Sequence, residues 1–134
     1  MQDTGRRLLI AGWVFGIGSL VHILDHLRRG QGSISDELLW LGNAALVLQV
    51  VVVTLILVHH QQAPRWAAVA GIPLAIGFLG AHWLPEWSVL SDPIWEISDL
   101  TWLSITASLA EILGALLVAV AGIATLRSMR TATT

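Results

Sequence analysis

Residues 38–58 read LLWLGNAALVLQVVVVTLILV and contain no charged side chain. A helix needs roughly 20 mostly apolar residues to cross a hydrocarbon core of about 30 Å, so this run is long enough to span a bilayer. The run also lacks the continuous polar face that a surface helix of a soluble bundle shows. It therefore predicts a transmembrane helix and decides the fold class.

Three further runs have the same length and character. Residues 8–27 are apolar until His22, residues 66–84 contain Pro73, and residues 100–126 carry a single acid, Glu111. Short connections favour antiparallel neighbours. The sequence therefore predicts an all-α integral membrane protein, a single domain over residues 1–134 that folds as an antiparallel bundle of four transmembrane helices. The predicted helices cover residues 8–27, 38–60, 66–84 and 100–126.

The composition agrees with this fold class and excludes several functions. Hydrophobic residues make up 55% of the chain and charged residues 12%, whereas soluble domains carry about 25% charged residues. The net charge of -2 argues against a nucleic-acid-binding surface. Lysine and cysteine are absent, which excludes a Schiff base, thiolate catalysis, disulfides and cysteine-ligated metals.

The arginines predict the orientation, because cytoplasmic segments carry the excess of Arg and Lys. Most of them lie next to the two termini or in the connection at residues 61–65, and only Arg28 and Arg29 fall at the opposite end. We therefore expect a multi-pass protein of a bacterial plasma membrane, with its N and C termini in the cytoplasm and the lipid bilayer as its surroundings.

Two connections carry local signals. A cluster of small and polar residues breaks the chain before the second helix, and its last member is placed to cap that helix. The cluster consists of Gly30, Gly32, Ser33 and Ser35. Residues 85–99 form the longest connection, where Asp92 followed by Pro93 predicts the start of a short amphipathic helix lying on the membrane surface.

Small residues and amides predict how the helices pack, because apolar helices gain little hydrophobic energy from one another in lipid. The fourth helix carries a stripe of small and polar residues that is expected to face inward, at Ser104, Ser108, Glu111, Ala115, Val118 and Gly122. In the second helix, Asn43 and Gln49 lie about 240° apart at 100° per residue. One of these amides is expected to face the bundle and the other a subunit partner.

A histidine cluster is the feature most indicative of chemistry. His22 and His26 are spaced i and i+4, so both rings can lie on one helix face, and Asp25 is close enough to orient or join them. His82 lies near the same end of a helix that runs in the same direction. These residues predict a metal site in the outer half of the bundle, with His22, His26 and His82 as ligands.

The carboxylates Asp25 and Glu111 are the candidate catalytic residues. Charged side chains are costly at membrane depth and usually mark function, and Glu111 would act as the general acid or base. The structural alternative makes Glu111 a hydrogen-bonded packing residue and pairs Asp25 with a neighbouring arginine. His59 and His60 end the second helix on the opposite side of the membrane and are not expected to join the cluster.

The sequence supports several hypotheses about function, and it does not decide whether the chain is an enzyme. A divalent metal (Zn, Fe or Cu) on the histidines would serve a lipophilic small-molecule substrate that arrives from the bilayer. His82 with His22 or His26 would alternatively ligate one haem b, with Gly18 and Ala75 leaving room for the macrocycle. A proton or ion pathway, or an accessory subunit of a homo-oligomer or larger membrane complex, needs neither group.

Overall fold

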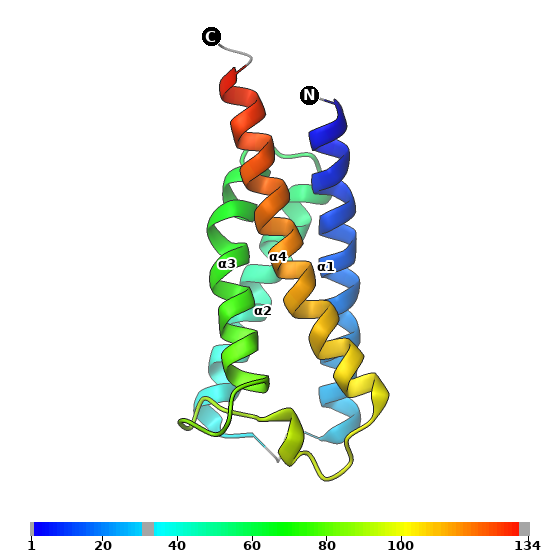
Figure 1. Ribbon diagram of the computed structural model, residues 1–134, viewed down its shortest axis with the longest axis vertical. Coiled ribbons are helices and arrows are strands. Elements are labelled where there is room, and N and C mark those ends of the chain that lie inside the picture. The colour runs from blue at the N-terminus through cyan, green and yellow to red at the C-terminus, as the bar shows by residue number, and fades with distance from the viewer. Residues whose placement is uncertain (1, 31–33, 132–134) are drawn as a thin grey trace.

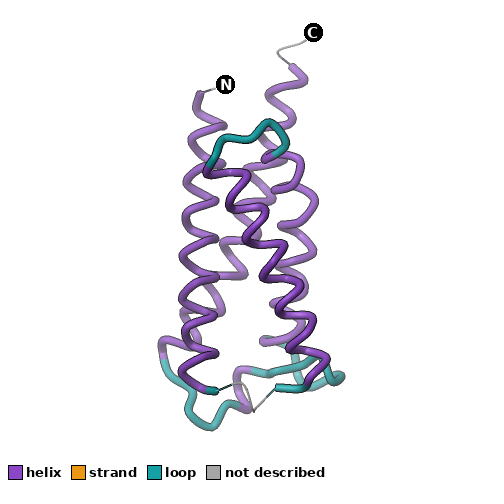
Figure 2. Tube along the Cα trace, turned by 180° about the vertical axis from the view of Figure 1, so that it is seen from behind, coloured by secondary structure: helices purple, strands orange, loops and turns teal. Residues whose placement is uncertain are grey.

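The computed structural model describes residues 2–30 and 34–131, and these residues form four long helices that run alternately up and down (Figure 1). The helices are α1 (Gln2–Arg29), α2 (Asp36–Leu57), α3 (Ala63–His82) and α4 (Trp102–Thr131). Both ends of the chain lie at one end of the bundle, which we call the terminal end. The opposite end, which we call the loop end, carries the end of α1, the start of α2 and the 83–101 connection (Figure 2).

Each helix is long and apolar enough to cross a membrane. All four predicted helices are present, but their ends differ from the prediction: α1 begins six residues before residue 8, and α4 covers 102–131 rather than 100–126. α2 ends at Leu57 rather than at residue 60, so His59 and His60 follow the helix, and α3 covers 63–82 rather than 66–84. The extra turns carry Arg6, Arg7, Arg127 and Arg130. Apolar length locates the part of a helix that needs hydrocarbon, and arginine side chains allow the same helix to continue into the polar layer.

Helix α4 packs tightly against both α1 and α3. A Cβ atom added at Gly114 would lie 2.7 Å from the Cα of Phe15, and one added at Gly71 would lie 2.7 Å from the carbonyl oxygen of Ala115. Such close backbone approach through small residues is how helices associate in lipid. The predicted inward stripe of α4 is also confirmed, because all six of its residues are buried.

Helix α2 is the loosely packed member of the bundle. Only 17% of its most apolar stretch is buried, against 44% for α1 and for α4. Gly12 and Gly16 of α1 face side chains of α2, namely Ile56 and Val53. Contact between α1 and α2 is therefore concentrated in the terminal half of the bundle, where the apolar core lies. This core contains the fully buried Phe15, Val52, Ala115 and Val118.

The loop-end connections differ in part from the prediction. The hydroxyl of Ser35 accepts a hydrogen bond from the backbone N–H of Leu38 at 3.1 Å, which confirms the predicted helix cap. Gly32 and Ser33 lie outside the described residues. The predicted surface helix after Asp92 is only a 3₁₀ turn, η2 (Ile94–Glu96), with Pro93 in the N-cap position.

The 83–101 segment contains little helix, because several of its polar groups donate hydrogen bonds to carbonyl groups of α3. The backbone N–H of Asp92 donates to the carbonyl of Ala81 at 2.8 Å, and the indole of Trp87 donates to the carbonyl of Gly80 at 2.8 Å. Ile94 is 3% exposed. The segment is thus fastened to the end of α3 rather than free to form an amphipathic helix on a membrane surface.

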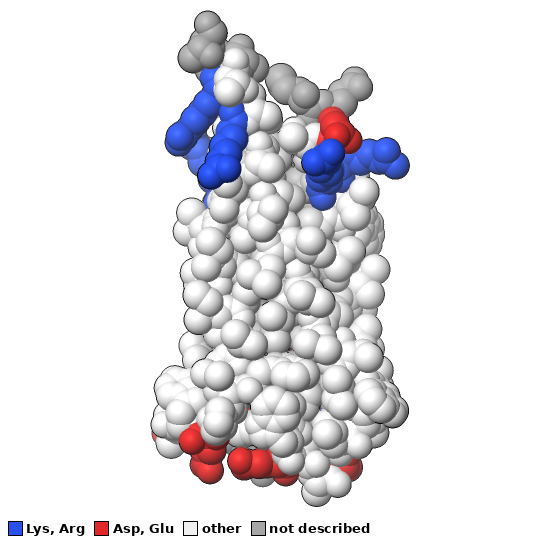
Figure 3. Space-filling view, viewed as in Figure 1, with Lys and Arg blue, Asp and Glu red and all other residues white. Residues whose placement is uncertain are grey.

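The two ends of the bundle differ in exposed charge (Figure 3). Arginines stand out at the terminal end, whereas acidic side chains mark the loop end in the same view. Arg28 and Arg29, the two arginines of the loop end, bond to acidic residues instead. Their partners are Asp25, Asp92 and Asp99.

The close approach of α4 to α1 leads to a stability prediction. Gly114→Ala places a methyl group against the Phe15 backbone, so we expect a loss of about 1–3 kcal/mol in the free energy of unfolding, the usual cost of overpacking. Unfolding in denaturing detergent, followed by circular dichroism, measures the loss. Gly77→Ala is the matched control, because a Cβ there meets nothing within 4 Å. Equal stability of the two variants would contradict the close packing.

Candidate metal centre

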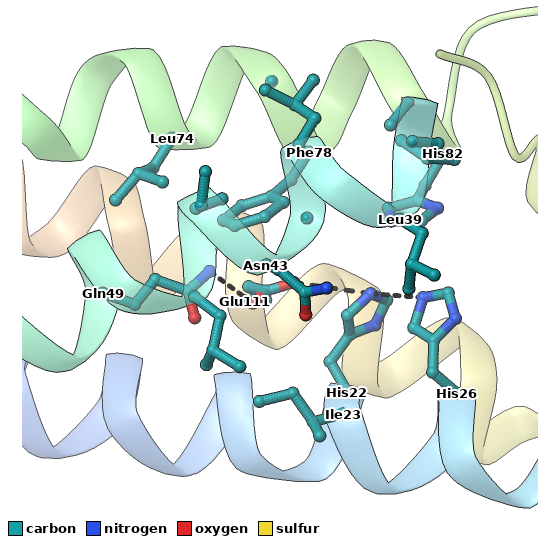
Figure 4. A pocket seen from close by; sticks show the side chains of 18 of the residues that line it. His22, Ile23, His26, Leu39, Asn43, Gln49, Leu74, Phe78, His82 and Glu111 are labelled. Carbon is teal, nitrogen blue, oxygen red and sulfur yellow. Dashed lines mark hydrogen bonds and ion pairs between the residues drawn. The ribbon is translucent and has the colours of Figure 1, made fainter. Parts of the chain in front are cut away.

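Three histidine rings from α1 and α3 meet at the loop end of the bundle (Figure 4). The ring centroids of His22, His26 and His82 lie 4.6 to 5.6 Å apart. One ring nitrogen from each residue lies within 4.8 Å of the other two. Ligands of a tetrahedral Zn²⁺ at about 2.0–2.1 Å lie roughly 3.4 Å from one another. The three rings can therefore converge on one cation after small movements.

The local helical sequence explains why these rings meet. His22 and His26 are one turn apart on α1, and their Nε2 atoms lie 3.1 Å apart. His82 is the last residue of α3, which runs in the same direction as α1, and its ring contacts the rings of His22 and His26. The predicted common depth of the three histidines is confirmed by these ring contacts.

The ring of His82 is held in an orientation suited to a ligand. Its Nδ1 lies 3.2 Å from the backbone carbonyl oxygen of Asp92, which can only accept a hydrogen bond. Nδ1 therefore carries the proton of the neutral ring, and Nε2 keeps its lone pair. Metal-binding histidines commonly donate their second ring N–H to such a carbonyl.

His26 has a different neighbour, the guanidinium of Arg29. Arg29 Nη2 lies 3.1 Å from His26 Nδ1, and a guanidinium can only donate. If His26 held a cation through Nε2, its ring proton would be on Nδ1, and Arg29 would have to leave this contact. Its alternative partners are already in place, because Asp25 and Asp92 lie 3.2 and 3.7 Å away.

Glu111 of α4 lies beside the histidines. Its Oε2 is 3.5 Å from His22 Nε2, and its Oε1 accepts a hydrogen bond from Gln49 Nε2 at 3.0 Å. Among the described residues, Glu111 Oε2, Gln49 Oε1 and His22 Nδ1 are buried without a hydrogen-bond partner. Buried polar atoms normally have such partners, so these three atoms are available to hydrogen-bond a ligand.

Asp25 lies away from this group. Its side chain is 1% exposed, and its two oxygens accept hydrogen bonds from Arg28, Arg29 and Ser104 at 3.0 to 3.2 Å. This arrangement matches the structural alternative, in which Asp25 pairs with a neighbouring arginine. Asp25 is not one of the residues whose ligand atoms converge.

An apolar pocket of about 440 Å³ adjoins the three histidines and Glu111, within the usual range of roughly 300–1,000 Å³ for ligand pockets. α1, α2 and α3 form most of its wall. Its polar lining consists of His22, His26, Asn43, Gln49, His82 and Glu111. The polar side chains are spread along the pocket from Gln49 to His26 and His82, and Leu74 and Phe78 form part of its apolar wall on α3 (Figure 4).

Sequence reasoning missed two members of this neighbourhood, Asp92 and Arg29. The sequence predicts Asp92 only as the start of a helix, whereas its Oδ2 lies 3.6 Å from His82 Nδ1. The side chain of Arg29 is only 5% exposed, which its place beside Gly30 did not indicate. The contacts of both residues involve the 83–101 segment, and the sequence does not predict the path of that segment.

The two amides of α2 are also placed by the structure. Gln49 is the bundle-facing amide, and Asn43 is exposed on the pocket wall. His59 and His60 are exposed at the terminal end, as expected. They are not in the metal-ligand group found among the described residues.

Comparison with known proteins gives no match to a protein-family model, a curated protein or a solved structure. The bundle and its histidine cluster together define a helical protein with four helices that could cross a membrane and a possible metal site at one end.

The pairing of Asp25 leads to a second stability prediction. Asp25→Asn removes the charge that holds a buried guanidinium, and hydrogen bonds to charged groups contribute about 1.5–3 kcal/mol. We expect a loss of that size in the free energy of unfolding, measured in denaturing detergent. Asp3→Asn is the control, because its pair with Arg7 is exposed and exposed pairs contribute little. Equal free energies of unfolding for the two variants would show that the Asp25 ion pairs do not stabilise the fold.

Proposed function

We propose that this chain is a multi-pass membrane protein that holds one divalent cation on His22, His26 and His82 and uses it for chemistry on a lipophilic substrate. The convergence of the three rings beside an apolar pocket is the observation that carries this proposal. Imidazole ligands suit Zn, Cu and Fe. Held by these three imidazoles, such a cation would supply a Lewis acid or would activate a water molecule.

Glu111 is the proposed general acid or base of this site. It lies at the wall of the pocket, next to His22, where it can exchange a proton with a substrate or a bound water. Gln49 orients the carboxyl group by donating to one of its oxygens. Asp25 was also a candidate catalytic residue; its bonds to Arg28, Arg29 and Ser104 support a positioning role instead.

The position of the apolar core favours this proposal over a proton or ion pathway. The polar lining of the pocket reaches from the loop end to Gln49 and Glu111. Toward the terminal end the described interior continues as the apolar core, with Phe15, Val52 and Val118 fully buried. A pocket that is closed at one end by tightly packed apolar side chains is suited to holding a substrate rather than to conducting an ion.

The spacing of the rings favours a small cation over haem b. The three imidazoles contact one another directly, with no plane free between two of them for a macrocycle. The space expected beside Gly18 is also taken, because a Cβ added there would lie 2.9 Å from the backbone of Ala110 in α4. Ala75 is likewise buried in the apolar core.

We also propose that both termini face the cytoplasm of a bacterial cell. The exposed arginines of the terminal end support this orientation. Arg28 and Arg29, which count against it in the sequence, are offset by Asp25, Asp92 and Asp99. The metal site would then lie on the outer side of the membrane.

Metal content tests the proposed function. Protein purified in mild detergent without chelators is expected to contain about one Zn, Fe or Cu per chain. His22→Ala and His82→Ala each remove a ligand and should lose the metal, whereas Glu111→Gln should keep it. The double variant His59→Ala, His60→Ala is the control and should also keep it, because both histidines are exposed at the terminal end.

Three results would contradict the proposal. The first is an absence of stoichiometric metal in the wild type, both as purified and after loading with each of these ions. The second is equal loss of metal in the control double variant. The third is a Soret band in the optical spectrum, which would identify haem as the bound group.

A further inference from the structure

We infer that the pocket binds a single hydrocarbon chain carrying an uncharged head with a hydrogen-bond donor, a hydroxyl or an amide N–H, and that this amphiphile reaches the pocket from the bilayer beside α2. The inference rests on the proposed function, because it names the substrate class of the same site. It goes further by assigning the chain, the head and the side of access.

The pocket opens along α2, on the side of the bundle that faces lipid when the helices span a membrane. Leu41, Gly42 and Asn43 line the pocket, and all three are exposed on α2. On the α3 side, Pro73 and Gly77 are also exposed pocket residues. An opening flanked by small and apolar residues at the depth of a membrane span gives access to molecules dissolved in hydrocarbon.

The 83–101 segment covers the loop end of the site. Asp92, Pro93 and Ile94 are buried, and Asp92 lies directly against His82. The hydroxyl of Ser35 donates to the carbonyl of Val89, which fastens this segment to the start of α2. A ligand from water meets this covering first, whereas a ligand from the bilayer meets the opening beside α2.

The amides of α2 define the head group. Gln49 Nε2 is occupied by Glu111, so Gln49 Oε1 is left as a buried acceptor without a partner. Asn43 presents a second amide on the same wall (Figure 4). Acceptors require a donor on the ligand, and burying one unpaired costs about 1–3 kcal/mol. A hydroxyl or an amide N–H satisfies Gln49 without adding a charge at membrane depth, which is costly.

The rest of the pocket suits a hydrocarbon chain. Beyond its six polar residues, the wall consists of aliphatic side chains, glycine, proline and Phe78. The pocket lies mainly between α1, α2 and α3 and has a volume of about 440 Å³. A chain extending from the head beside Gln49 would lie against Leu74 and Phe78, with its end toward the opening.

Two glycines of α3 provide a matched test. A Cβ atom meets nothing within 4 Å at Gly77 or at Gly80, but only Gly77 lines the pocket. Gly77→Leu should therefore fill part of the pocket without disturbing the helix packing, and Gly80→Leu should leave the pocket open. Gly42→Leu, at an equally open position on the α2 wall, serves as a second blocking variant.

The probe is a long-chain primary alcohol with a photoreactive group on its chain, added to the protein in lipid nanodiscs and mapped by mass spectrometry. We expect labelling on pocket residues of α2 and α3, reduced at least tenfold in Gly77→Leu and unchanged in Gly80→Leu. Unlabelled alcohol should compete about fivefold better than its methyl ether of equal chain length, the effect of one hydrogen bond. The alkane of the same length should compete more weakly still.

Metal content measured on the same samples separates this inference from the proposed function. Pocket labelling with the expected pattern in protein that binds no metal would support the ligand class and refute the metal site. Bound metal together with equal labelling of both leucine variants, spread over lipid-facing residues, would refute the ligand inference alone. Equal competition by the alcohol and its ether would overturn the assigned head group.

Discussion

The close approach of α4 to α1 and α3 is the constraint on which the site depends. Gly18 and Gly114 bring α1 and α4 together, and Gly71 does the same for α3 and α4. This contact places Glu111 beside His22, although the two residues come from different helices. Because α4 occupies the space between its neighbours, α2 is left at the side of the bundle, and the pocket forms where α2 fails to fill the gap.

Ion pairs at the loop end hold the histidines in place. Asp25 forms ion pairs with Arg28 and Arg29 in the last turn of α1. The side chain of Arg29 also lies close to Asp92 in the 83–101 segment. Asp92 in turn fixes the ring of His82 through its backbone carbonyl. The acidic residues offset the positive charge of Arg29, so a cation can be held next to it.

The sequence predicted the features that depend on a single helix and on the alternating direction of the helices. The four spans followed from apolar length, the pairing of His22 with His26 from their i, i+4 spacing, and the inward face of Glu111 from the small residues around it. The depth of His82 followed from helix direction. Asp92 and the burial of Arg29 could not be predicted, because their contacts cross a connection with no regular structure. The loose packing of α2 was not predicted either, although this helix contains a single glycine, Gly42.

X-ray absorption at the metal edge, measured on the detergent-solubilised protein after zinc loading, tests the central claim most directly. The account predicts a first coordination shell with about three imidazole nitrogens at about 2.0–2.1 Å and the outer-shell scattering typical of histidine rings. A first shell made only of oxygen atoms, or zinc that is removed by washing, would contradict the assignment of His22, His26 and His82 as a metal centre.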